Sequence, residues 1–105
     1  MPLTTLGKIL LVQMSAAGYS LIAAYEEAFD RLTDAIVLES NWKRKAAQPY
    51  VLLFRGSAEY MKRGGRLTQR QAERLISLID EAKSGWKRDK EVTEACGLLE
   101  AAFKG

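Results

Sequence analysis

Cationic side chains are the residues whose type and spacing could do chemistry in this sequence. Arg66, Arg70 and Arg74 recur every four residues, which on an α-helix places them along one edge at intervals of about 6 Å. Lys62 and Arg63 come just before them, on the other side of a Gly-Gly pair. Guanidinium and ammonium groups in such a row can hold the phosphates of a nucleic-acid backbone. The alternative is that the row is an ordinary solvated helix face.

Two further cationic sites each begin with a tryptophan, in WKRK at 42–45 and WKRD at 86–89. A tryptophan beside Lys-Arg can stack on an unpaired base while the cations hold phosphates. The structural alternative is that each motif follows a helix C-terminus, where cations are favourable, and that each tryptophan plugs an end of a bundle. The candidate nucleic-acid-binding residues are therefore Lys43, Arg44, Lys45, Lys62, Arg63, Arg66, Arg70, Arg74, Lys87 and Arg88, with Trp42 and Trp86 as candidate base-stacking residues.

Catalytic and metal chemistry has little support in the residue types. The chain has no histidine, which is the commonest general base and metal ligand near neutral pH. Its single cysteine, Cys96, lies on an apolar stripe and can build neither an internal disulfide nor a thiolate metal site. Adjacent carboxylates on a helix point about 100° apart, so they share no site. We expect a protein that is not an enzyme and needs no cofactor or metal.

The distribution of charge favours an anionic partner. The formal net charge is only +3, but residues 40–90 hold thirteen cationic and five acidic residues, a surplus of eight. The two ends of the chain are acidic by comparison. Segregation of this kind is typical of proteins that bind anionic surfaces.

The elements that must position these residues are predicted to be helices. Apolar residues recur at helical spacing almost throughout, and no stretch alternates with a period of two. The length suits one domain, residues 1–105, and we expect an all-α, compact bundle of about five short helices. A first helix is predicted from Thr4 or Thr5 to about Ala16, and a second from near Ser20.

The remaining three helices include a predicted helical hairpin at residues 49–83. Pro49 suits the first turn of one helix, Gly64-Gly65 ends it, and Thr68 with Gln71 forms a capping box for the next. The last helix is predicted over about 90–103. The predicted inward faces, in chain order, are Ile22, Tyr25, Phe29, Leu32 and Ile36; Val51, Phe54, Ala58 and Met61; Leu75, Ile76, Ile79 and Ala82; and Val92, Cys96, Leu99 and Phe103.

One stretch resembles a known family. LTQRQAERLISLI at 67–79 is similar to the opening of the first helix in helix-turn-helix transcription factors of the LuxR and sigma-factor type, and KEVTEACGL at 90–98 loosely continues the likeness. The sequence ends at Gly105, so we expect no recognition helix after it and assign no base-reading role. In size, helicity and basic middle, the chain also resembles small helical subunits of CRISPR effector complexes and small phage-encoded inhibitors.

The sequence therefore predicts a non-enzymatic basic protein that contacts an RNA or DNA backbone without strong sequence preference, as a small subunit of a nucleoprotein assembly. The alternative is a protein-interaction module, a small regulator or phage-type inhibitor, that docks on an acidic partner and forms homodimers through exposed Tyr50, Tyr60 or Phe54. Polar breaks in the apolar N-terminal stretch favour a buried helix over a signal peptide or membrane span, so we expect a cytoplasmic protein without membrane contact.

Overall fold

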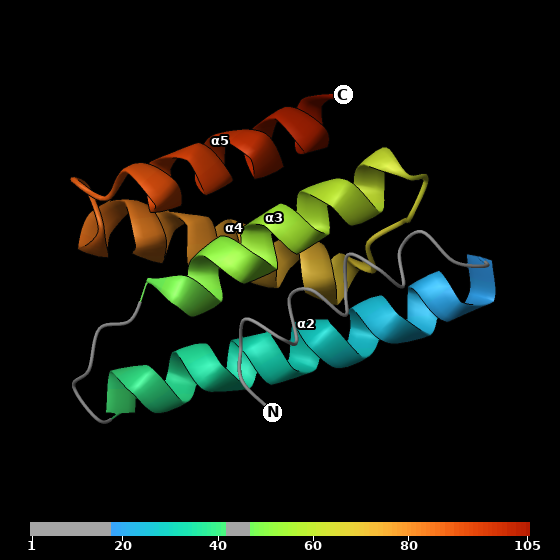
Figure 1. Cartoon of the computed structure of the whole chain (residues 1–105), viewed down its shortest axis with the longest axis horizontal. Coiled ribbons are helices and arrows are strands. Elements are labelled where there is room, and N and C mark those ends of the chain that lie inside the picture. Colours follow the sequence, from blue (N-terminus) through green and yellow to red (C-terminus); the bar gives the residue numbers. More distant parts are fainter. Residues whose placement is uncertain (1–17, 42–46) are drawn as a thin grey trace.

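The computed structural model describes residues 18–41 and 47–105, and these ranges form four α-helices without any strand (Figure 1). Helix α2 spans Gly18–Asn41, α3 spans Gln48–Lys62, α4 spans Gln69–Gly85 and α5 spans Lys90–Lys104. The predicted all-α class is confirmed, and the last four helices lie close to their expected bounds. The expected helix between Thr4 or Thr5 and Ala16 lies outside the described residues.

The ends of α3, α4 and α5 follow from short-range chemistry. The capping box at the start of α4 is confirmed: Thr68 Oγ1 accepts from the Gln71 N–H at 3.1 Å, and Gln71 Oε1 accepts from the Thr68 N–H at 2.9 Å. Asp89 caps α5 by accepting from the Val92 N–H at 3.1 Å. Gly64 ends α3 with a φ of +93°, a conformation that other residues rarely adopt.

Helix α3 lies at the centre of the bundle (Figure 1). It packs against α2 on one side and α5 on the other, whereas α4 packs mainly against α5. The hairpin formed by α3 and α4 is present, but these two helices touch each other only lightly. The reason is that α3 already buries most of its circumference, including Val51, Leu53 and Phe54, against its other two neighbours.

The core confirms most of the predicted inward faces and corrects three positions. Ile22, Ile76 and Phe103 are 51%, 53% and 38% exposed, so their assignment to the core was wrong. Leu21 and Leu78 are buried in the same helices as the first two. One residue along a helix rotates the side chain by about 100°, so a small error in placing the apolar stripe moves its edge residues into solvent.

A buried polar contact joins α2 to α3. The Tyr25 hydroxyl and Ser57 Oγ are 2.7 Å apart, and both side chains are almost fully buried. The Tyr25 ring also stacks on Tyr60, with centroids 4.0 Å apart and an interplanar angle of 3°. Tyr60 and Phe54 are buried, so the expectation that these two rings are exposed was wrong, whereas Tyr50 is half-buried and a homodimer contact through it stays a prediction.

Candidate nucleic-acid interface

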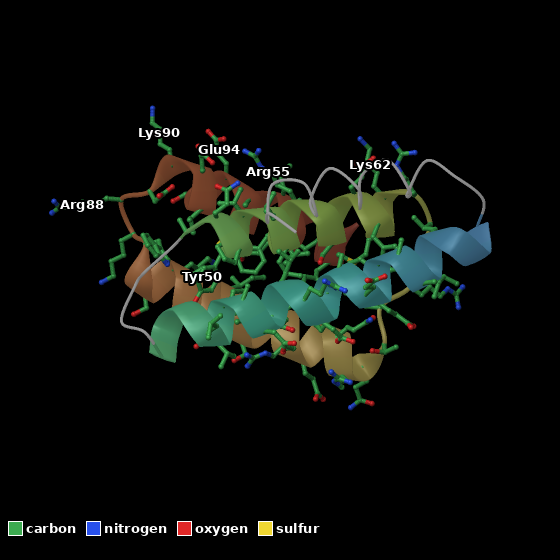
Figure 2. The ribbon with its side chains drawn as sticks, turned by 60° about the horizontal axis from the view of Figure 1, so that its bottom comes forward. Tyr50, Arg55, Lys62, Arg88, Lys90 and Glu94 are labelled. Carbon is green, nitrogen blue, oxygen red and sulfur yellow. The ribbon has the colours of Figure 1, made fainter. Side chains whose placement is uncertain are left out.

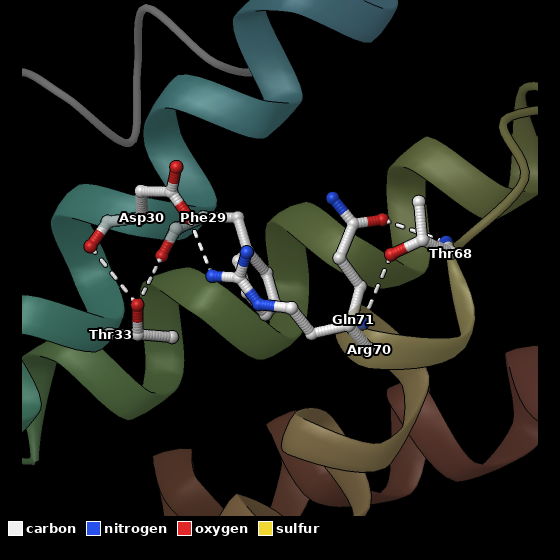
Figure 3. A network of polar contacts seen from close by, with 6 residues as sticks. All are labelled: Phe29, Asp30, Thr33, Thr68, Arg70 and Gln71. Atoms are coloured by element: carbon white, nitrogen blue, oxygen red, sulfur yellow. Dashed lines mark hydrogen bonds and ion pairs between the residues drawn. The ribbon is translucent and has the colours of Figure 1, made fainter.

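The arginine row does not form one continuous helical edge. Helix α4 begins at Gln69, so Arg66 lies in the preceding connection and only Arg70 and Arg74 are on the helix. These two arginines face α2, where they line a hollow of about 430 Å³ between the two helices. Arg70 Nη2 also lies 3.6 Å from Asp30 Oδ1 of α2 (Figure 3). The same turn of α2 carries Thr33, whose hydroxyl donates to the backbone carbonyls of Phe29 and Asp30 (Figure 3).

The side of α2 that meets the row is acidic. Glu26, Asp30 and Asp34 follow one another every four residues and are exposed. Both partners of the pair between Arg70 and Asp30 are well exposed, at 83% and 63% of their side chains, so the contact contributes about 0–1 kcal/mol. The carboxylates nevertheless lower the positive potential that a phosphate would meet at Arg70. Phosphate binding by the arginine row stays a prediction. The neighbouring carboxylates make the row a less favourable phosphate site than a group of cations without acidic neighbours.

The turn between α3 and α4 holds the next group of predicted cations. Arg63 Nε lies 2.7 Å from Glu59 Oε1, one helical turn back on α3. Lys62 and Arg66 are exposed and have no ion-pair partner within the described ranges. The five cations expected in one region are thus divided, with Arg63 paired locally and Arg70 turned toward α2.

The turn between α4 and α5 keeps its cations free of such partners. Lys87, Arg88 and Lys90 are exposed, and none is in an ion pair with another described residue. Arg88 and Lys90 extend away from the bundle (Figure 2). The nearest acid in sequence, Asp89, directs a carboxylate oxygen to the Val92 N–H as the cap of α5. Residues 87–91 thus hold three cations without ion-pair partners in the described ranges, together with Asp89 and the exposed Glu91, and carry a formal charge of +1.

Trp86 lies next to this cationic turn and is half-buried. It packs against the hydrophobic core, as its structural alternative requires, but it also lines a hollow of about 430 Å³ between α4 and α5. Lys83 and Lys87 lie at the same hollow, and Gly97 leaves space where another residue would place a side chain. The Trp86 indole thus packs against the core and also forms part of the wall of a hollow that two lysines line.

One ion pair crosses this hollow. Lys83 Nζ lies 2.9 Å from Glu100 Oε1, and this contact raises the pKa of the exposed Lys83 ammonium group, which stays charged at neutral pH. Glu100 therefore offsets Lys83, whereas Lys87, which also lines the hollow, is in no ion pair with a described residue. We expect Lys87 to be the hollow's main contact for an anionic group.

The two Trp-Lys-Arg motifs follow helices that end together. Helices α2 and α4 run in the same direction and finish at the end of the bundle where α5 begins (Figure 1). The first motif starts directly after Asn41, the last residue of α2, and the second directly after Gly85, the last residue of α4. Trp42, Lys43, Arg44 and Lys45 themselves lie outside the described residues.

Charge alone does not make the described part of the protein basic. Residues 18–41 and 47–105 hold twelve cationic and thirteen acidic residues. The positive surplus of the whole chain comes from Lys8 and from Lys43, Arg44 and Lys45. Within the described ranges, only a local group of cations without nearby acids could attract an anion, and residue counts do not show which cations are in ion pairs.

Other kinds of site find no support in the part of the chain that the structure describes. No group of three or more His, Cys, Asp or Glu side chains there is placed to hold a metal ion. Cys96 is buried, and burial raises the pKa of its thiol, which disfavours the reactive thiolate. Within the same ranges, no helix is both long enough and apolar enough to cross a membrane.

Comparison with known proteins finds no relative: no protein-family model, curated protein or solved structure matches this chain.

The arrangement of α4 and α5 can be compared with the helix-turn-helix motif that residues 67–79 resemble. Helices α4 and α5 are joined by a short turn but run antiparallel along each other (Figure 1), whereas the two helices of that motif cross steeply. The assignment of a binding role therefore has to come from the site itself.

Proposed function

We propose that this protein binds single-stranded nucleic acid without catalysing a reaction, and that its contact surface is the end of the bundle at the α4–α5 turn. The observation that carries the proposal is Trp86, which borders an open hollow beside Lys87, next to a turn whose cations are in no ion pair with another described residue. An aromatic ring next to cations is the combination that single-strand binders use.

In this proposal the parts have different roles. One unpaired base enters the hollow and stacks on Trp86, which the core holds in place. Lys87, Arg88 and Lys90 contact successive phosphates, and the WKRK motif that follows α2 supplies further cations. Stacking and phosphate contacts are available with every base, so little sequence preference is expected and both RNA and DNA are ligands.

The small size of the proposed contact surface suggests that the protein functions together with others. A few cations and one stacking residue bind weakly on their own, because each phosphate contact adds little at physiological salt. We therefore propose that the protein works as a small subunit of a nucleoprotein assembly, where several such surfaces act together. We also propose a cytoplasmic location, a reducing environment with which a single buried cysteine is compatible.

The protein-interaction module remains a second candidate, because a specific feature favours it. An apolar groove edged by cations lies between α3 and α5, away from the Trp86 hollow. Homodimerisation through Phe54 or Tyr60 is no longer part of this candidate, since both rings are buried.

The test of the proposed function is a fluorescence-anisotropy titration with a labelled single strand and a labelled duplex of equal length. Measurements at about 50 and 200 mM salt cover the range in which phosphate contacts lose strength. We expect the single strand to bind more tightly than the duplex, and binding to fall steeply with salt. Absence of binding to both probes at the lower salt would refute the proposal.

A further inference from the structure

A groove of about 510 Å³ runs between α3 and α5. Its lining includes the small side chains of Ala58 on α3 and of Ala101 and Ala102 on α5. Leu98 borders the groove from α5 and is 52% exposed. The groove thus offers apolar surface that this chain, within its described ranges, does not cover.

Two cations stand along the α3 edge of the groove. Arg55 and Lys62 are seven residues apart, two helical turns or about 10.5 Å. Both are exposed, neither has an ion-pair partner among the described residues, and Figure 2 shows both projecting from the same side of the bundle. Glu59 lies between them, but Arg63 holds its carboxylate at 2.7 Å and offsets its charge. Glu94 of α5 also projects from this side of the bundle (Figure 2).

The lining follows the spacing of two helix faces. The α3 edge supplies residues 55, 58, 59, 61 and 62, and the α5 edge supplies 98, 101 and 102, followed by Gly105 just after the end of α5. Residues 55, 58, 59 and 62 have the spacing i, i+3, i+4, i+7 on α3, and residues 98, 101 and 102 have the spacing i, i+3, i+4 on α5, so each set lies along one face of its helix. A third helix can lie in the furrow between two such faces, with its apolar side chains against the alanines and Leu98.

We propose that this groove docks an acidic amphipathic helix of a partner protein. The apolar face of that helix covers Leu98 and the alanines, and two of its carboxylates, seven residues apart, meet Arg55 and Lys62. Charge complementarity selects this occupant, because a basic helix would bring like charges against both cations. The inference does not depend on nucleic-acid binding, which is assigned to another side of α5.

The experiment is a selection followed by a charge exchange. A displayed library of amphipathic helices of about 18 residues, five turns, has a fixed apolar stripe and randomised flanking positions. We expect selection on the full chain to enrich pairs of Asp or Glu seven residues apart. Failure to enrich acidic pairs would overturn the proposal.

The enriched peptide is then titrated, by anisotropy, against the protein and its variants. Reversing both cations, in Arg55→Glu with Lys62→Glu, should weaken binding at least about tenfold, and a peptide with lysines in place of its two acids should recover it. Leu98→Ala should weaken binding about fivefold, as expected when half of a leucine side chain is no longer covered. Equal affinity of the acidic peptide for the protein and the charge-reversed variant would overturn the proposal.

Two controls separate the other occupants. Lys87→Glu with Arg88→Glu is the matched charge reversal outside the groove and should leave peptide affinity unchanged. If the Arg55 and Lys62 reversal instead weakens oligonucleotide binding as strongly as the Lys87 and Arg88 reversal does, the groove belongs to the nucleic-acid surface and the proposal is wrong. If sedimentation shows a dimer that Leu98→Glu dissociates, a second copy fills the groove, which also overturns the proposal. Because all these residues are exposed, circular dichroism should show unchanged helicity in each variant.

Discussion

Removing the charges of Lys87 and Arg88 tests the proposed interface most directly. Both side chains are exposed in the turn between α4 and α5, and neither has an ion-pair partner in the described ranges. The double variant Lys87→Ala with Arg88→Ala should therefore change the free energy of unfolding by no more than about 0.5 kcal/mol per site. A loss of binding can then be attributed to the interface and not to the fold.

The magnitude follows from counterion release. Each phosphate contact with a single strand contributes about 0.7 to the slope of log K against log salt concentration. Contacts from Lys87, Arg88 and Lys90 give a slope of about 2.1, so affinity falls about 18-fold between 50 and 200 mM salt. With Lys90 alone the slope is about 0.7 and the fall about 2.6-fold. Contacts made by residues 43–45 add equally to both proteins, so the difference between the two slopes stays near 1.4.

The matched control removes two charges from the arginine row, in Arg70→Ala with Arg74→Ala. This variant loses the same net charge as the test variant, but from a surface that lies against the carboxylates of α2. We expect its slope to equal that of the unmodified protein. A slope reduced by about 1.4 in this control, with no reduction in the Lys87 and Arg88 variant, would refute the placement of the interface and assign phosphate contacts to the row.

Stacking on Trp86 adds a contribution that salt does not affect. Trp86→Leu keeps an apolar side chain against the core but removes the indole face that borders the hollow. Base stacking on an aromatic ring is worth about 1–3 kcal/mol, so affinity for the single strand should fall about 5- to 150-fold with an unchanged slope. If the affinity for the single strand is unchanged, Trp86 has only a structural role at the end of α4.

Three further predictions concern the scaffold. Ser57→Ala leaves the Tyr25 hydroxyl buried without its partner and should lower the free energy of unfolding, measured by urea denaturation, by about 1–3 kcal/mol. In a Tyr25→Phe background the same change should lower it by about 1 kcal/mol less, and equal losses in the two backgrounds would contradict the hydrogen bond. Gly64→Ala should destabilise the protein by about 1 kcal/mol, because residue 64 has a positive φ. Gly97→Ala adds a Cβ in open space and should stabilise the protein by about 0.5–1 kcal/mol through the higher helix propensity of alanine; thermal unfolding measures both changes. Burial raises the pKa of Tyr25 above its ordinary value of 10.0, so above that pH the native state binds more protons than the unfolded state. The free energy of unfolding should therefore fall as the pH rises beyond 10, and it should fall less in Tyr25→Phe.

Much of the fold could be predicted because its signals are local. Thr68 and Gln71 are three residues apart, Gly64 follows directly on α3, and Pro49 lies in its first turn, so each signal and its effect fall within one or two turns of chain. The apolar spacing of α2 placed Tyr25 and Phe29 correctly for the same reason. Such features need no knowledge of which helix packs against which.

The candidate site could be predicted less well, because it depends on contacts between helices. The sequence shows Arg70 only as part of a cationic row, whereas the fold brings it beside Asp30 of α2, forty residues earlier in the sequence. Ser57 gave no signal of its own, since its importance lies in facing Tyr25 across the core. The hollow at Trp86 is lined from α5 as well, where Gly97 leaves open space, so neither residue reveals the hollow alone.

The two proposed binding surfaces are compatible because α5 separates them. Cys96, Gly97 and Glu100 line the Trp86 hollow on the α4 side, whereas Leu98, Ala101 and Ala102 line the groove on the α3 side. Residues 97 and 98 are adjacent yet belong to different surfaces, since successive side chains on a helix point about 100° apart. A helix in the groove would therefore leave the hollow open to a nucleic-acid strand, and binding of both ligands at once is what a small subunit of a nucleoprotein assembly would require.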